Sequence, residues 1–220
     1  KFIAGCVKKG FTKANAEKLW AQIQPFADYS FNKAHATCYA LISYWTAYLK
    51  AHYPDAFMAA LMTSDQDDID RLAIEISECR HMGLSVVNPD VNQSFVEFAI
   101  VPNEKTIRFG MAAVKGVGTG AVEEILRARE DGEFKSIADF AKRVSTRKVN
   151  RKAWESLIKA GAFDALGDRS DILFNVDTIL GYASKLQKEA LAGQTDLFGG
   201  LESAVATPEI TLETAPERHT

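Results

Sequence analysis

The sequence predicts a mainly α-helical protein that carries a small antiparallel β unit. Through most of the chain, apolar residues recur at the three- to four-residue spacing of amphipathic helices. The stretch 84–110 differs, because short β-branched and aromatic runs alternate there with the turn sequences NPDVNQ and PNEK. The 220 residues are 47% hydrophobic and 25% charged, a composition typical of a globular chain that buries a sizeable core.

Start and stop signals for helices divide the part of the chain before this β unit. An amphipathic stretch spans 14–23, and Asn32 is a good N-cap for a helix that Pro54 ends. A further helix starts at Pro54, and another follows the acidic sequence DQDDID (65–70) and stops at Gly83. Three aromatic residues on these helices are expected in the core: Trp45, Tyr48 and Phe57.

The chain returns to helix after the β unit. A short helix is expected up to about Val114 and another from about Thr119. Further helices are expected over ADFAKRV, over a stretch that Asn150 can cap and Gly161 ends, and over about 169–191. Residues after Ala192 are rich in Gly, Thr, Glu and Pro, which indicates a linker or loose tail.

Composition and spacing exclude several classes of protein. The three cysteines, Cys6, Cys38 and Cys79, are odd in number and far apart, which indicates a reducing compartment and argues against a disulfide framework or a zinc site. No apolar run approaches the roughly 18 residues of a membrane span. DQDDID lacks the glycine and closing glutamate of a calcium loop. The N-terminus lacks a secretory signal and an initiator Met, so we expect a piece of a longer chain.

The distribution of charge points to one basic segment. A net charge of −3 argues against a chain that is basic throughout. However, KRVSTRKVNRK (142–152) contains only cations among its charged residues. Such a patch can bind phosphates, although a solvated helix face and loop have the same composition.

Three glycines in AAVKGVGTGAVEEI (112–125) stand between helical flanks. The spacing Gly116-x-Gly118-x-x-Ala121 fits a dinucleotide fingerprint, but that fingerprint requires a preceding strand and a parallel βαβ sheet. A P-loop is excluded because no Gly-Lys-Ser/Thr follows. A helix-hairpin-helix fits better, and the alternative is a purely structural tight turn between packed helices.

In a helix-hairpin-helix, glycines leave the amides at the start of the second helix uncovered, so that a DNA phosphate can approach them. Val117 is expected to point inward and hold the hairpin closed. Replacing Gly116 or Gly118 with valine should then weaken duplex binding without unfolding the domain. The candidate DNA-binding residues of this hairpin are Lys115, Gly116, Val117, Gly118, Thr119 and Gly120.

A degenerate second copy follows in LIKAGAFDALGD (157–168), where Gly161-Ala162-Phe163 takes the place of Gly116-Val117-Gly118. The basic run lies between the two copies. Two such hairpins, packed with pseudo-twofold symmetry, would grip both strands of a duplex across the minor groove without regard to sequence. The further candidate DNA-binding residues are Arg147, Lys148, Arg151, Lys152 and Gly161.

Two long stretches carry a family resemblance. YSFNKAHATCYALISYWTAYLKAHYPDAFMAALMTSD resembles the fingers of the alpha subunits of bacterial replicative DNA polymerase III, which are C-family DNA polymerases. MGLSVVNPDVNQSFVEFAI, IRFGMAAVKGVGTGAVEEILRARE and LIKAGAFD resemble the continuation of these proteins into a tandem helix-hairpin-helix domain. The resemblance covers residues 2–199; Ala34 departs from it, since the family usually has Ser there.

The resemblance implies four regions along the chain. Residues 1–83 would be the C-terminal part of the polymerase fingers, and residues 84–110 the small β unit. Residues 111–192 would be the tandem helix-hairpin-helix DNA-binding domain, and residues 193–220 a flexible linker with a motif that binds the sliding clamp.

The resemblance also implies two further sites. The fingers would contact the incoming deoxynucleotide through Asn32, Lys33 and His35. Independently, Lys33 and His35 lie in the first turn of a predicted helix, where amides suit a phosphate; alternatively, Lys33 is solvated and His35 caps or packs. The clamp-binding residues in QTDLFGG would be Gln194, Leu197 and Phe198, although Leu197 and Phe198 alone also suit an anchor that folds the tail back.

For the parent protein, the resemblance implies template-directed DNA synthesis by nucleotidyl transfer in the bacterial cytoplasm. Magnesium would be held by palm carboxylates upstream of this segment, so we expect no catalytic residue, metal or cofactor here; Asp65-x-Asp67 has a suitable spacing but falls in a loop. The expected partners are primer–template duplex, incoming deoxynucleotide, the sliding clamp and other replicase holoenzyme subunits, with no membrane. A non-catalytic repair scaffold with tandem hairpins is the rival, but it leaves FNKAHATCYALISYW and QTDLF unexplained.

Overall fold

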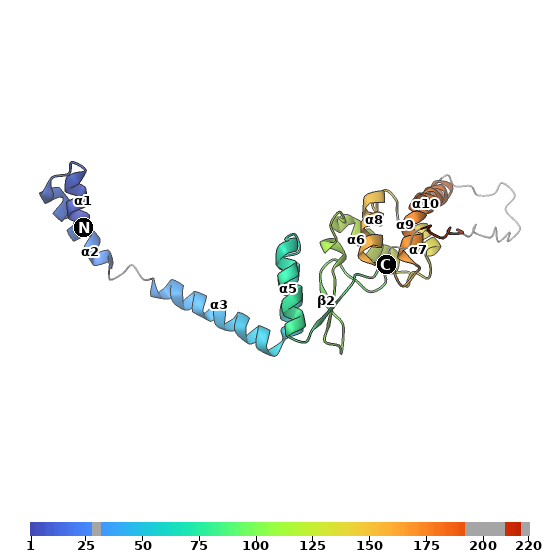
Figure 1. The fold of residues 1–220 in the computed structure, drawn as a ribbon, viewed down its shortest axis with the longest axis horizontal. Helices are drawn as coiled ribbons and strands as arrows, with labels where there is room; N and C mark the ends of the chain where they lie inside the picture. The colour runs from blue at the N-terminus through green and yellow to red at the C-terminus, as the bar shows by residue number, and fades with distance from the viewer. Residues whose placement is uncertain (28–31, 192–209, 217–220) are drawn as a thin grey trace, which may run out of the picture. The chain divides into compact units, whose positions relative to one another are not determined.

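A computed structural model describes residues 1–27, 32–191 and 210–216, and the chain divides into two compact units, Lys1–His52 and Tyr53–Thr220 (Figure 1). The first unit contains α1 (Phe2–Lys8), α2 (Lys13–Ala27) and α3 (Lys33–His52). α1 packs on α2, where the rings of Phe2 and Trp20 lie 5.3 Å apart and Ala16 is fully buried. The helix expected over 14–23 is therefore confirmed and extends further in both directions.

Helix α3 begins as the sequence predicts. The Asn32 side chain accepts a hydrogen bond from the His35 amide at 3.0 Å, as an N-cap does. The expectation that Trp45 and Tyr48 belong to the core is wrong within this unit, since α3 has no buried residue and these side chains are 54% and 45% exposed. Aromatic side chains on one helix are buried only by a neighbouring element, and helical spacing does not supply one.

The second unit begins with two helices that share a core with a small sheet. α4 (Pro54–Ser64) starts at Pro54 as expected, and α5 (Ile69–His81) is followed by Gly83 with a φ of 74°. The strands are β1 (Ser85–Val87), β2 (Ala99–Ile100) and β3 (Thr106–Arg108). Their common core consists of Met58, Ala59, Met62, Leu72, Cys79, Leu84, Phe98 and Ile107, with Phe57 packed against it. A boundary at residue 83 would therefore cut through this core.

The sheet is mixed rather than antiparallel. β2 pairs with β3 antiparallel, across the PNEK turn, but β1 pairs with β3 parallel, with Val86 opposite Ile107. Parallel pairing requires a long crossover, which residues 88–105 provide. The turn signals indicate where strands end, but they do not determine which neighbour each strand selects.

The remaining helices surround a second core (Figure 1). They are η1 (Met111–Ala113), α6 (Thr119–Arg129), α7 (Ile137–Arg143), α8 (Arg151–Ala160), α9 (Arg169–Phe174) and α10 (Val176–Leu191). An aromatic cluster occupies the centre, since Phe140 lies 4.7–4.9 Å from the rings of Phe134, Trp154 and Phe163. These elements, named the helical body below, confirm the prediction of a mainly α-helical fold.

The long helix expected over 169–191 is interrupted at Asn175, a buried residue between α9 and α10. Its side chain accepts from the amide of Glu213 and donates to the carbonyl of the same residue, at 3.1 and 2.7 Å. The Ala215 amide donates to Asp171 at 2.8 Å. Residues 210–216 are therefore docked on α9, which corrects the expectation of a loose tail for that part of the chain.

Among the described helices, none combines the length and the apolar composition that a membrane crossing requires.

Candidate nucleic-acid interface

The first hairpin has the geometry that the sequence predicts. η1 ends at Ala113, and α6 begins at Thr119 with Gly118 as its N-cap in extended conformation. Val117 points into the core and is 6% exposed, and its amide donates to the carbonyl of Val114 at 2.9 Å. Residues 115–120, the first hairpin, therefore form a closed turn that the buried Val117 side chain holds in place.

The start of α6 presents amides that the described protein does not use. The first amide of the helix with a partner is that of Ala121, which donates to the Gly118 carbonyl at 2.9 Å. Among the described residues, nothing accepts from the amides of Gly118, Thr119 and Gly120, and no side chain caps the helix. An α-helix leaves its first amides unpaired and its N-terminus carries a partial positive charge, so these groups suit an anion.

The three glycines of this hairpin have different roles. Gly116 has a φ of 92°, and a Cβ atom there would lie 3.0 Å from Ser156 Oγ and 3.1 Å from Lys152 Cε. It is needed for the turn and for close packing on α8. Gly118 and Gly120 have no atom within 4 Å of such a Cβ, so they keep the amides uncovered. The expectation that valine at either position leaves the fold intact therefore stays a prediction for Gly118, whereas the left-handed φ and close packing of Gly116 predict strain for any side chain there.

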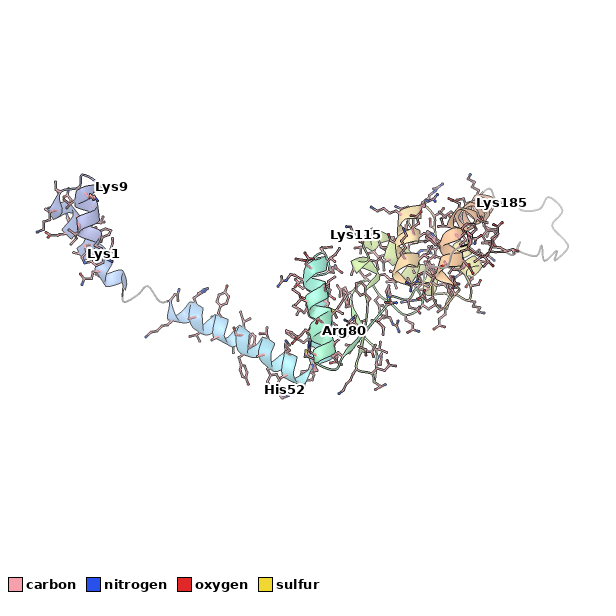
Figure 2. The ribbon with its side chains drawn as sticks, in the orientation of Figure 1. Lys1, Lys9, His52, Arg80, Lys115 and Lys185 are labelled. Carbon is pink, nitrogen blue, oxygen red and sulfur yellow. The ribbon has the colours of Figure 1, made fainter. Side chains whose placement is uncertain are left out.

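The basic run is distributed over different parts of the surface. Lys115 and Lys152 flank the first hairpin; both are exposed, and neither has an acidic partner among the described residues. Lys148 pairs with Glu124 at 3.2 Å, and Arg151 pairs with Glu155 and Asp177. Arg147 lines a separate cleft. Figure 2 shows Lys115 at the hairpin, well away from Lys185 of α10 on the same helical body.

The second turn, residues 161–168, lacks the free amides of the first hairpin. Gly161 is the left-handed C-cap of α8 with a φ of 88°, and its amide donates to the Ile158 carbonyl at 3.0 Å. Asp168 caps α9 and accepts from the amides of Ser170 and Asp171 at 2.9 and 3.2 Å. A carboxylate therefore covers amides at the start of α9, and Gly161 shapes the turn as the C-cap of α8.

A buried carboxylate that sequence reasoning missed holds α6 in place. The Glu124 side chain is 1% exposed and accepts from Arg127 at 2.7 and 3.1 Å and from the Ser145 amide at 3.2 Å. These hydrogen bonds, with Arg127 first, and the pairing with Lys148 lower the pKa of Glu124 to about 2 despite its burial. The Glu124–Arg127 spacing is a visible helical pair, but the sequence gives no signal for the contact with the 144–150 loop.

The acidic stretch 65–70 behaves as a turn and helix start, as expected. Asp68 caps α5 by accepting from the Arg71 amide at 3.1 Å, and Asp65 pairs with Arg71 at 3.2 Å. Burial, followed by the hydrogen bond with Asp65, raises the pKa of Glu75 to about 7. Within the described chain, no group of three or more His, Cys, Asp or Glu residues is arranged to hold a metal ion.

Of the residues expected to contact nucleotide, Asn32 is occupied as the N-cap of α3. Lys33 and His35 are exposed in the first turn, where the His35 ring packs edge-on against Tyr39 at 4.4 Å. The proposed clamp-binding residues Gln194, Leu197 and Phe198 lie outside the described residues.

Comparison with known proteins supports the hairpin assignment. A family profile described as a helix-hairpin-helix motif matches residues 83–172, which include both turns. The chain is 46% identical over 209 residues to DNA polymerase III subunit alpha of Saccharopolyspora erythraea, an alignment that covers 92% of this chain and 17% of the relative.

The same protein from two other bacteria gives similar values. Identity is 44% over 214 residues for Mycobacterium tuberculosis, covering 94% of this chain and 18% of the relative, and 43% over 203 residues for Thermus aquaticus, covering 92% and 16%. The chain thus spans less than a fifth of the length of these curated relatives. It belongs to the family of bacterial DNA polymerase III alpha subunits, and corresponds to one segment of them that contains the helix-hairpin-helix motif.

Proposed function

We propose that the first hairpin binds the sugar–phosphate backbone of primer–template duplex, so that this chain serves as a duplex-holding segment of a template-directed DNA polymerase. The observation that carries the proposal is the set of three amides at residues 118–120, which have no hydrogen-bond partner among the described residues and no side-chain cap. A phosphate oxygen accepts hydrogen bonds from such amides and is stabilised by the helix N-terminus.

The surroundings support phosphate binding without sequence recognition. Lys115 belongs to the hairpin itself, and the Lys152 side chain lies against Gly116, so two positive charges adjoin this turn. Backbone amides and lysines at phosphates fix the position of a duplex but do not discriminate between bases. A polymerase that moves along its product needs contacts of this kind, because it meets every sequence in turn.

Fluorescence anisotropy with two labelled 24-base-pair duplexes of unrelated sequence tests this proposal. The chain should bind both equally, and affinity should fall steeply with salt, because phosphate contacts release counterions. The double variant Lys115→Ala/Lys152→Ala should weaken binding to both duplexes alike and reduce the slope of log K against log salt by about 2. A double variant of exposed lysines elsewhere, Lys105→Ala/Lys135→Ala, is the matched control. Equal binding by the two double variants would overturn the proposal.

Nucleotidyl transfer itself is proposed for the longer parent protein and not for this segment. The Asp65-x-Asp67 pair lies in the turn between α4 and α5, and Asp65 is paired with Arg71. Incubating the chain with primed template, deoxynucleotides and magnesium should therefore give no primer extension. Measurable extension by a preparation free of other polymerases would contradict this assignment.

Two further contacts are proposed from family membership. Asn32, Lys33 and His35 would lie near the incoming deoxynucleotide, and Gln194, Leu197 and Phe198 would bind the sliding clamp. Deletion of residues 194–198 should abolish capture of the chain by immobilised clamp while duplex binding stays unchanged. Retained capture would show that the QTDLF sequence has another role.

A further inference from the structure

A cationic cleft of about 440 Å³ lies on the helical body, apart from the first hairpin. Its walls are the second half of α6, the end of α7, the 144–150 loop and the end of α10. Five cationic side chains line this basic cleft: Arg127, Lys142, Arg143, Arg147 and Lys188. A single carboxylate, that of Glu124, lines it as well. Such a concentration of positive charge stands out in a chain whose net charge is −3.

The carboxylate does not neutralise the cleft. Glu124 is buried, and both of its oxygens are already engaged, by Arg127, by the Ser145 amide and by Lys148 at 3.2 Å. Arg127 and Lys148 therefore balance its charge within the fold. Glu124 therefore does not neutralise Lys142, Arg147 or Lys188.

The remaining cations are of two kinds. Arg143 is structural: it pairs with Asp139 at 3.2 Å, donates to the Gly132 carbonyl at 2.7 Å and lies over the Phe134 ring. Lys142, Arg147 and Lys188 are exposed, and within the described chain none of these three has an acidic partner. Like charges placed together in this way repel, so they add nothing to the stability of the fold.

The walls of the cleft are held in fixed positions. The amide and hydroxyl of Thr146 donate to Gln187 Oε1 at 3.2 and 3.1 Å, and Gln187 Nε2 donates to the Val144 carbonyl at 2.8 Å. These bonds tie α10 to the 144–150 loop. Three cations from three segments are therefore held around one hollow, which is the arrangement that a multiply charged anion requires.

We propose that the basic cleft binds backbone phosphates of duplex DNA and extends the footprint of the first hairpin; this inference rests on the proposed function. None of the described residues that line the cleft is aromatic, so it offers no platform for stacking unpaired bases. Along α6, the eight residue steps from Thr119 to Arg127 correspond to about 12 Å, or roughly three to four base pairs of one strand. One duplex can therefore reach both surfaces.

The test uses the whole chain and the triple variant Lys142→Ala/Arg147→Ala/Lys188→Ala. Its thermal unfolding should match that of the parent, because these side chains have no hydrogen-bond or ion-pair partner in the part of the chain that the structure describes. Binding to the 24-base-pair duplex should weaken about tenfold or more at 0.1 M salt, and the salt slope should fall by about 2 to 3. Returning a positive charge to position 147, in the variant Lys142→Ala/Arg147→Lys/Lys188→Ala, should recover part of the affinity and of the salt slope. A phosphate contact of this kind needs a positive charge rather than the planar guanidinium of arginine.

The matched control is Lys105→Ala/Lys135→Ala/Lys159→Ala, which removes three exposed cations outside the cleft. If the cleft triple variant binds the duplex as tightly as this control variant, the inference is overturned. This holds even where inorganic tripolyphosphate raises the unfolding temperature of the parent and not that of the triple variant. If the cleft triple loses affinity while Lys115→Ala/Lys152→Ala does not, the cleft stands and the hairpin proposal fails. If instead Lys115→Ala/Lys152→Ala loses affinity and the cleft triple variant does not, the hairpin proposal stands and the cleft inference fails.

Discussion

The first hairpin (115–120) and the second turn (161–168) look alike in sequence and differ in what they do at the helix that follows. Both connect two helices, and both contain a glycine in left-handed conformation, Gly116 and Gly161. In the first hairpin the N-terminus of α6 has no side-chain cap, whereas in the second turn Asp168 caps α9. The N-terminus of α6 is thus free to bind an anion from another molecule, whereas the N-terminus of α9 is already covered by the carboxylate of Asp168.

This difference shows that an open helix N-terminus must be stabilised from elsewhere. α9 is held locally by its cap and by the Arg169–Asp164 pair at 2.5 Å. α6 lacks both, and its strongest polar anchor is Glu124 in the middle of the helix, bonded to the 144–150 loop. Leaving the amides of residues 118–120 uncovered is therefore compatible with a rigid hairpin.

The largest effect is expected from removing that anchor. Glu124→Gln keeps the shape of the side chain but loses the charge that Arg127 and Lys148 stabilise, so the free energy of unfolding near neutral pH should fall by about 2–3 kcal/mol. Urea unfolding followed by tryptophan fluorescence would measure this, with Glu123→Gln on the exposed face of α6 as the control. A change below about 0.5 kcal/mol would show that Glu124 does not anchor α6.

The effect of Glu124 should depend on pH with a definite sign. Its pKa in the fold, about 2, lies below the ordinary value of 4.5, so the carboxylate contributes stability above pH 4.5 and loses it as the pH falls towards 2. The gap between parent and Glu124→Gln should be constant near neutrality and close between pH 4.5 and 2. A gap that stays constant down to pH 2 would contradict the pairing.

The two turns should also respond differently to a side chain on their glycines. Gly161→Val forces a β-branched residue into the left-handed region and overlaps the Arg169 guanidinium, so it should destabilise the chain by about 2 kcal/mol. Gly118→Val occupies open space at a φ of −85° and should cost less than about 1 kcal/mol. Thermal or urea unfolding of both variants measures the contrast. Equal losses would mean that Gly118 has a structural role too.

The sequence predicts those features of the two turns that depend only on residues close together in the chain. The first hairpin, the cap Asn150 and the stop at Gly161 depend on neighbouring residues, and all three are present in the structure. The helix expected from about residue 169 starts at Arg169, directly after Asp168, whose side chain caps it. Asp is a common N-cap residue, so this cap too is a local signal.

Long-range features could not be predicted in the same way. The parallel pairing of β1 with β3, the break at Asn175 and the basic cleft all join residues that are distant in the sequence. Helical spacing shows which side chains share a face, but not which other segment meets that face. For the same reason α3 carries the apolar spacing of a core helix and buries none of its side chains in the unit 1–52.

The comparison can be broken by giving the first hairpin the cap of the second turn. Gly118→Asp places a carboxylate over the amides of residues 119–121, in space that is open. Stability should rise by about 0.5–1 kcal/mol, as for a good N-cap. Duplex affinity should fall about tenfold, because the carboxylate replaces and repels the phosphate. Gly118→Asn caps without charge and should weaken binding less; equal loss in both would attribute the effect to shape alone.

The smallest effect is expected from the converse change. Asp168→Ala removes the cap of α9 and should cost about 1 kcal/mol, with exposed Glu104→Ala as a control for the loss of one acid. Duplex affinity should change less than twofold, since the amides thus freed belong to a six-residue helix whose turn also carries Asp164. An increase of tenfold or more, beyond that of Glu104→Ala, would show that the second turn is a phosphate site which Asp168 keeps closed. The two turns would then differ by one side chain rather than in kind.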